Sequence, residues 1–189
     1  ELDLGGAIME VVRSVEMLSE PVVMNGVVVK GFGRGSKMLG IPTANLPESS
    51  LSQLPHDWRT GIYFGWATVG GKGPYKMVTS VGWNPYFANK TKTVEPHLLN
   101  EFKEDFYGAE IHIVMTGYLR PELNFDGLES LIAAIHDDIE VSSKALDQPN
   151  HRALRRLAHT SPGGVFGGFL GSSPVAVAVV GVAAAFAVS

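Results

Sequence analysis

The hydrophobic residues of this chain fall mainly in short runs that alternate with polar residues or are rich in β-branched side chains. Runs of this kind, bounded by Gly, Pro, Asn and Asp, are typical of β-strands. Two of them flank the sequence Gly-Gly-Lys-Gly-Pro, which predicts a hairpin. The expected strands cover residues 22–29, 61–69, 75–81, 93–100 and 110–119.

Two other stretches follow a helical period. Pro21 ends the first, which predicts a short N-terminal helix over residues 7–18. The second begins near Asp126, a candidate N-cap with Glu129 three residues later, and predicts one long helix. The apolar stripe of the first helix would contain Ile8, Val11, Val12, Val15 and Leu18, and that of the second Leu128, Leu131, Ile132, Ile135 and Ile139.

This order of elements indicates the fold class. Several strands in succession, then one long helix, favour an antiparallel barrel or sandwich with a helix packed on it over alternating β-α-β units. With 189 residues and 45% hydrophobic content, one main domain is expected. The predicted division is a helical extension over 1–21, a core domain over 22–150, and a basic segment with an apolar tail over 151–189.

The apolar tail has two interpretations. Residues 163–188 contain no charged side chain, and three arginines lie upstream, as they do beside a cytoplasmic membrane surface. As a helix, the fifteen residues 174–188 would span about 22 Å, less than the roughly 30 Å hydrocarbon core of a bilayer. The tail therefore leaves membrane association open but does not favour it over packing on its own domain or a neighbour.

Charge and composition narrow the functional classes. A formal net charge of -4, with no long run of Lys or Arg, argues against nucleic-acid binding. The absence of cysteine excludes disulfides and thiolate chemistry and suits the reducing cytoplasm. A targeting segment ahead of Glu1 stays open. We expect a cytoplasmic monomer that acts on small molecules.

A glycine-rich basic loop is the first candidate site. Residues 30–47 read KGFGRGSKMLGIPTANLP, in which the glycines let backbone N–H groups turn toward an anion, and Arg34 and Lys37 add positive charge. Thr43 and Asn45, two residues apart in an extended segment, would point the same way and offer hard oxygens of the kind Mg²⁺ accepts. Neither the Walker nor the dinucleotide-binding fingerprint fits. The alternative is an ordinary surface loop followed by a strand.

Glu95 is the candidate catalytic group. Strand alternation puts Glu95 and His97 on one face, with Val94 and Pro96 on the other. A carboxylate beside a bound alcohol can accept its proton during attack on a phosphoryl group. The alternative is a solvated surface glutamate and a structural histidine. Trp83, Tyr86, Phe87 and Phe125 could stack on a planar ligand, or could simply be buried.

Five motifs together resemble riboflavin kinase of the monofunctional eukaryotic type. They are GFGRGSKMLGIPTANLP, TGIYFGWATV, SVGWNPYF, TVEPHLLNEF with KEDFYG, and GYLRPELNFDGLESLIAAI, in order between about residues 22 and 149. The resemblance implies a six-stranded antiparallel Greek-key barrel with the long helix outside. It also implies transfer of the ATP γ-phosphate to the ribityl 5′-hydroxyl of riboflavin, which gives FMN and ADP.

The same resemblance assigns roles to residues that match the motifs. Glu95 would be the general base, Mg²⁺ (or Zn²⁺ or another divalent ion) would bind Thr43 and Asn45, and Arg120 and Phe125 would lie near the flavin. The residues expected at ATP are Gly31, Lys37, Thr43, Asn45 and Tyr107. Pro96, Asn100 and Leu123 depart from the family pattern. The competing hypotheses are a non-catalytic flavin-binding barrel and a membrane-tethered scaffold.

Overall fold

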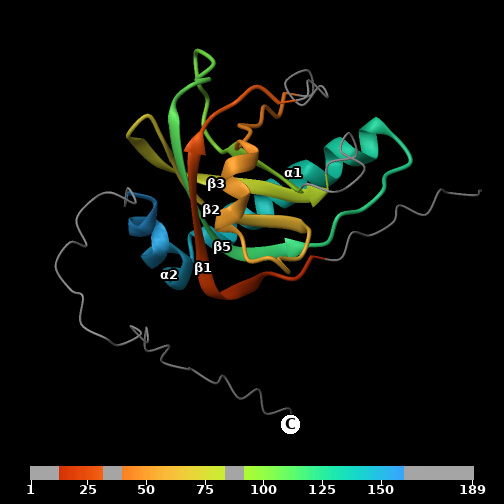
Figure 1. The fold of residues 1–189 in the computed structure, drawn as a ribbon. Coiled ribbons are helices and arrows are strands. Elements are labelled where there is room, and N and C mark those ends of the chain that lie inside the picture. Colours follow the sequence, from red (N-terminus) through yellow and green to blue (C-terminus); the bar gives the residue numbers. More distant parts are fainter. Residues whose placement is uncertain (1–12, 32–39, 84–91, 160–189) are drawn as a thin grey trace, which may run out of the picture.

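The fold is an antiparallel sheet, described by a computed structural model for residues 13–31, 40–83 and 92–159 (Figure 1). Its five strands are ordered β1-β5-β2-β3-β4. The strands are β1 (Glu16–Val27), β2 (Gly61–Val69), β3 (Lys72–Trp83), β4 (Lys92–Leu98) and β5 (Glu110–Arg120). Because β5 returns to lie beside β2, strands β2 to β5 form a Greek key. The predicted mainly β, Greek-key fold class is confirmed.

Residues 44–46 lie along the free edge of β4. The N–H of Ala44 donates to the carbonyl of Pro96 (2.7 Å), and the N–H of Leu46 donates to the carbonyl of Val94 (3.2 Å). The two pairs have the antiparallel register of a strand ladder. Residues 44–46 therefore extend the sheet beyond β4.

The same residues also reach the chain just after β1. The N–H of Val29 donates to the carbonyl of Asn45 (3.0 Å), which forms an isolated bridge. The short segment thus occupies the sixth position, between β4 and the end of β1. The predicted six-stranded barrel needs correction, since the described residues form five strands that do not close into a barrel. Pro42 and Pro47 lack the N–H groups that a longer sixth strand would use.

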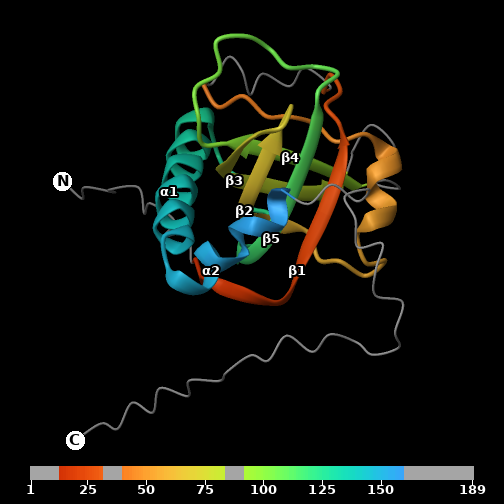
Figure 2. The same ribbon diagram turned by 90° about the vertical axis from the view of Figure 1, so that its left-hand side faces the viewer.

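The sheet separates two hydrophobic cores. Alternate strand residues point into an interior core that includes Met24, Tyr63, Met77, Val94 and Ile113. The outer face of β2 and β5 carries a second core beneath α1 (Leu128–Leu146), α2 (Pro149–Ala153) and η3 (Leu154–His159). The short helix η1 (Glu48–Gln53) lies on the opposite side from α1 and contacts β1 and β4 (Figure 2).

The predicted N-terminal helix is wrong where the structure describes it. Residues 13–15 are not helical, and residues 16–18 belong to β1. Glu16 and Met17 pair with Tyr118 and Gly117 of β5. A short amphipathic helix is marginal alone, whereas pairing with β5 satisfies backbone groups directly. Residues 7–12 lie outside the described residues.

Helix α1 exists as predicted, but its start and its buried face differ. It begins at Leu128 with Gly127 at the N-cap position, so Asp126 is not the cap. Leu128 is 57% exposed, and the other members of the predicted stripe are only half-buried. The fully buried positions along the helix are Ala134, Asp138, Ser142, Ala145 and Leu146. Hydrophobic periodicity missed this face because two of its residues are polar.

The packed structure extends on both sides of residues 22–150. Besides residues 16–21 of β1, it includes residues 151–159, in which His151 and Ala158 are buried. The indole N–H of Trp66 donates to the His151 carbonyl (3.0 Å), and the Thr68 hydroxyl donates to the Ala158 carbonyl (2.8 Å). Part of the predicted basic segment is therefore anchored on the sheet.

The buried ring of His151 predicts a pH dependence of stability. Desolvation lowers the pKa of His151 below its ordinary value of 6.5. The unfolded chain then binds a proton more readily than the folded protein, so the free energy of unfolding should fall as the pH drops below about 6.5. Urea unfolding at about pH 7.5 and 5.5 should show a smaller pH effect in His151→Asn than in the wild type. An equal effect of pH on the stability of both proteins would show that His151 is not the source of the pH dependence.

Several expectations concern residues outside the described ranges, namely Lys37, Tyr86, Phe87 and the tail from residue 160. Among the helices in residues 13–31, 40–83 and 92–159, none is long and apolar enough to cross a bilayer.

Candidate active site

The candidate site is formed where residues 43–45 pair with β4. Because Ala44 bonds Pro96 and Leu46 bonds Val94, the register sets Asn45 opposite Glu95. Side chains directly opposite in such a ladder have Cβ atoms about 4.5–5.5 Å apart. The sequence alone did not reveal this pairing, which brings the candidate base beside one of the two candidate metal-binding residues.

These residues face away from the interior core. Ala44 and Leu46 belong to that core, so the intervening Asn45 points outward. On β4, Val94 and Pro96 are buried, whereas Glu95 and His97 are half-buried. The predicted separation of these four β4 residues between two faces is confirmed.

Thr43 lies on the same outer face. Continuing the register by two residues sets Thr43 opposite His97. The His97 ring lies close to this segment, with Nδ1 2.7 Å from the carbonyl oxygen of Pro42. Thr43 and Asn45 therefore share one half-buried surface with His97 and Glu95.

Gly31 is packed against the Asn45 amide. A Cβ atom added to Gly31 would lie 2.5 Å from Asn45 Nδ2 and 2.8 Å from Oδ1, so only glycine permits this approach. Beside Gly31, the Lys30 ammonium lies 5.8 Å from the ring centroid of Tyr107, which is 49% exposed. The structure thus brings Gly31, Asn45 and Tyr107 into one region.

Arg120 and Phe125 lie at the end of β5 and in the loop that follows it. The Arg120 guanidinium carbon is 5.7 Å from the Phe125 ring centroid, and Nη1 donates to the Pro121 carbonyl (2.9 Å). The carboxylate of Glu122 lies against Gly82 of β3, where an added Cβ would be 2.3 Å from Oε1. This loop therefore borders the outer face of β3, next to β4.

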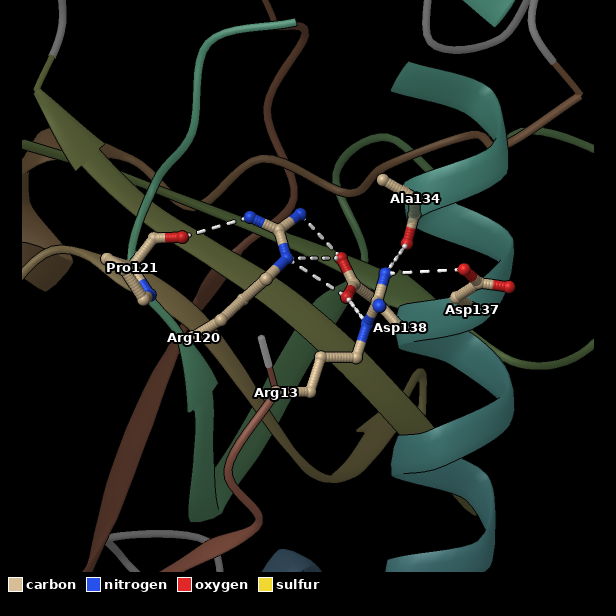
Figure 3. Close-up of polar contacts among 6 residues, drawn as sticks. All are labelled: Arg13, Arg120, Pro121, Ala134, Asp137 and Asp138. Carbon is tan, nitrogen blue, oxygen red and sulfur yellow. Dashed lines mark hydrogen bonds and ion pairs between the residues drawn. The ribbon is translucent and has the colours of Figure 1, made fainter. Parts of the chain in front are cut away.

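Arg120 is itself buried in an ion pair that sequence reasoning missed. Its side chain and that of Asp138 are each 3% exposed, and Nη2 lies 2.6 Å from Asp138 Oδ2 (Figure 3). Arg13 donates from Nε to Asp138 Oδ1 (2.7 Å) and from Nη2 to the Ala134 carbonyl (3.0 Å). One buried carboxylate thus joins β5, α1 and the chain before β1. In the sequence, the ion pair is indicated only by Asp138, which shares a helix face with the small residues Ala134 and Ser142.

The donor set suits a divalent ion held by few protein ligands. Thr43 and Asn45 offer a hydroxyl and an amide oxygen from one extended segment. In the described part of the chain, no group of three or more His, Cys, Asp or Glu side chains could hold a metal. Mg²⁺ typically binds one or two protein groups and completes its shell with water and substrate phosphates. Thr43 and Asn45 could therefore supply the few protein oxygens that such an ion needs.

The chain is similar to known proteins of one family. Residues 18–146 match the family model described as "Flavokinase: Riboflavin kinase". The chain is 57% identical over 139 residues to riboflavin kinase of Mus musculus, covering 74% of this chain and 90% of that protein. It is 56% identical over 135 residues to riboflavin kinase of Homo sapiens, covering 71% of this chain and 87% of that protein.

A solved structure extends the likeness to the fold. The crystal structure of riboflavin kinase from Trypanosoma brucei matches with a TM-score of 0.61 at 32% identity, covering 78% of this chain and 94% of that one. The family match covers most of β1 and all of β2 to β5 and α1, and it includes residues 43–45 and the β4 strand that they pair with. This chain therefore belongs to the riboflavin kinase family.

Proposed function

We infer that this protein transfers the γ-phosphate of ATP to the ribityl 5′-hydroxyl of riboflavin and releases FMN and ADP. The observation that carries this inference is the register of residues 44–46 on β4. It sets Asn45 opposite Glu95 on a half-buried outer face. A base beside an oxygen-donating segment suits phosphoryl transfer to an alcohol. Membership of the riboflavin kinase family supplies the substrate class.

Glu95 is proposed as the general base. Its carboxylate would accept the proton of the 5′-hydroxyl as the oxygen forms a bond to the γ-phosphorus and the bond to the β-phosphate oxygen breaks. Such transfers rely mainly on positioning and charge neutralisation, so a modest base is sufficient. The half-buried position of Glu95 on β4 is compatible with access to a bound alcohol.

Thr43 and Asn45 are proposed to hold Mg²⁺ with the ATP phosphates. When bound, the ion neutralises negative charge on the phosphate oxygens. Gly31 would approach the phosphates through its backbone, Lys37 would add positive charge, and Tyr107 would lie near the nucleotide. Support comes from the close packing of Gly31 on the Asn45 amide and from Lys30 beside Tyr107. Arg120 and Phe125 are proposed to border the flavin from the loop after β5.

The direct test is incubation of the full chain with riboflavin, ATP and Mg²⁺, followed by chromatography for FMN. FMN should form only when all three are present. Flavin binding without FMN would instead support a non-catalytic flavin-binding barrel. We further propose that the enzyme acts as a cytoplasmic monomer, which sedimentation and cell fractionation can examine.

Replacing Thr43 with Val should selectively weaken the binding of the metal ion at the site. The substitution keeps the shape of the side chain and removes the hydroxyl. The Mg²⁺ concentration for half-maximal rate should rise by roughly tenfold or more, with riboflavin affinity unchanged. Thr93→Val, at a half-buried position on β4, is the matched control. An unchanged Mg²⁺ dependence in Thr43→Val would remove Thr43 from the metal site.

A further inference from the structure

Two prolines interrupt the backbone ladder that holds residues 43–45 on β4. The N–H of Ala44 donates to the carbonyl of Pro96 (2.7 Å), but Pro96 has no N–H to donate in return. Pro42 lies two residues before Ala44 and also lacks an N–H. Backbone pairing with β4 is therefore weakest at the end of the segment that carries Thr43.

The His97 side chain makes a hydrogen bond at this weak end. Its Nδ1 lies 2.7 Å from the carbonyl oxygen of Pro42. Because a carbonyl oxygen only accepts, Nδ1 must carry a proton, as it does in one neutral tautomer and in the imidazolium. The imidazole therefore joins β4 to the chain immediately before Thr43, where the prolines cannot supply backbone donors.

We propose that His97 is a positioning residue that fixes Thr43 and Asn45 relative to Glu95 by holding the Pro42 carbonyl. The expected effect of His97 on nucleotide binding rests on the proposed function. Its expected effect on the position of the backbone at residues 42–45 does not. Residues 44–46 bond to β4 through only two backbone N–H groups. One further anchor at Pro42 therefore limits how far the Thr43 hydroxyl can move.

Three substitutions at position 97 separate this role from direct contact with a ligand. His97→Asn retains an N–H near the Nδ1 position, His97→Gln moves the amide toward the Nε2 position, and His97→Ala removes both. Losing a hydrogen bond of about 1 kcal/mol corresponds to roughly a fivefold change in an equilibrium constant. The KM for MgATP should rise roughly fivefold in His97→Ala and His97→Gln, with the KM for riboflavin unchanged. His97→Asn should recover most of the wild-type value.

Hydrogen exchange at the Ala44 amide tests the contact independently of catalysis. Exchange should accelerate several-fold in His97→Ala and stay near the wild-type rate in His97→Asn. The buried Pro96 offers a second test, since Pro96→Val restores an N–H that can donate to the Ala44 carbonyl. In the Pro96→Val background, His97→Ala should therefore accelerate exchange less. His136→Ala, at an exposed position on α1, is the control.

Two results would overturn the proposal. One is normal MgATP affinity in His97→Gln with a defect in His97→Asn, which would mean that the ring acts through Nε2 on a ligand. The other is unchanged Ala44 exchange in His97→Ala. If the wild-type protein makes no FMN, the proposed function fails, but the exchange measurements still decide whether His97 holds the segment.

Discussion

Glu95→Gln should reduce kcat by about 100-fold or more, the usual contribution of a positioned general base. Gln has nearly the same shape as Glu but cannot accept the proton of the 5′-hydroxyl. Because Glu95 is only half-buried and lies opposite the uncharged Asn45, the substitution should leave the fold and both substrate affinities close to the wild type. Steady-state rates with direct binding of riboflavin and MgADP will separate turnover from affinity.

Glu110→Gln is the matched control for this measurement. Glu110 is an exposed strand residue at the start of β5, so its substitution should change neither kcat nor KM. If Glu95→Gln retained wild-type turnover, Glu95 would have no role as the base. The transfer would then depend on positioning and charge neutralisation alone.

Asp138→Asn should destabilise the protein by about 3–5 kcal/mol, the usual effect of removing one partner from a buried ion pair. Asp138 accepts hydrogen bonds from the guanidinium groups of Arg120 and Arg13, whose side chains are 3% and 13% exposed. Asn is neutral, so both arginines would keep a positive charge with little solvent to compensate it. Chemical unfolding of wild type and variant measures the difference.

The neighbouring Asp137 provides an internal control. Its side chain is 63% exposed and lies 3.6 Å from Arg13 Nη2, a geometry in which ion pairs contribute about 0–1 kcal/mol. Asp137→Asn should therefore have a small effect. Equal destabilisation by the two substitutions would show that burial of the Asp138 pair is not the cause. Replacing Asp138, Arg120 and Arg13 together with apolar residues should recover part of the lost stability.

The local pattern of the sequence was enough to predict the faces of β4 and where the strands lie, except for residues 16–21 of β1. Alternation in Val94-Glu95-Pro96-His97 separates buried from half-buried side chains because successive strand residues point to opposite sides. The hairpin of β2 and β3 followed from its glycine-rich connection and two flanking apolar runs. The apolar spacing over residues 128–139 predicted helix α1. Each of these features depends on residues close together in the chain.

Contacts between residues far apart in the chain determined the features that local patterns did not predict. The apolar spacing over residues 7–18 predicted a helix, but residues 16–18 pair with β5 instead. Similarly, the buried face of α1 includes Asp138 because Arg120 and Arg13 reach it from other elements. The spacing of apolar residues cannot predict that a carboxylate is buried, because the arginines that pair with it lie far away in the sequence.

The sequence by itself determined which chemical groups are available: a glycine-rich basic loop, the oxygens of Thr43 and Asn45, and the carboxylate of Glu95. Only the tertiary structure decided that residues 44–46 lie between β4 and Val29, with Asn45 opposite Glu95. The physical reason is that the edges of β4 and β1 leave backbone groups unpaired, and a segment about 50 residues away from Glu95 in the chain satisfies them.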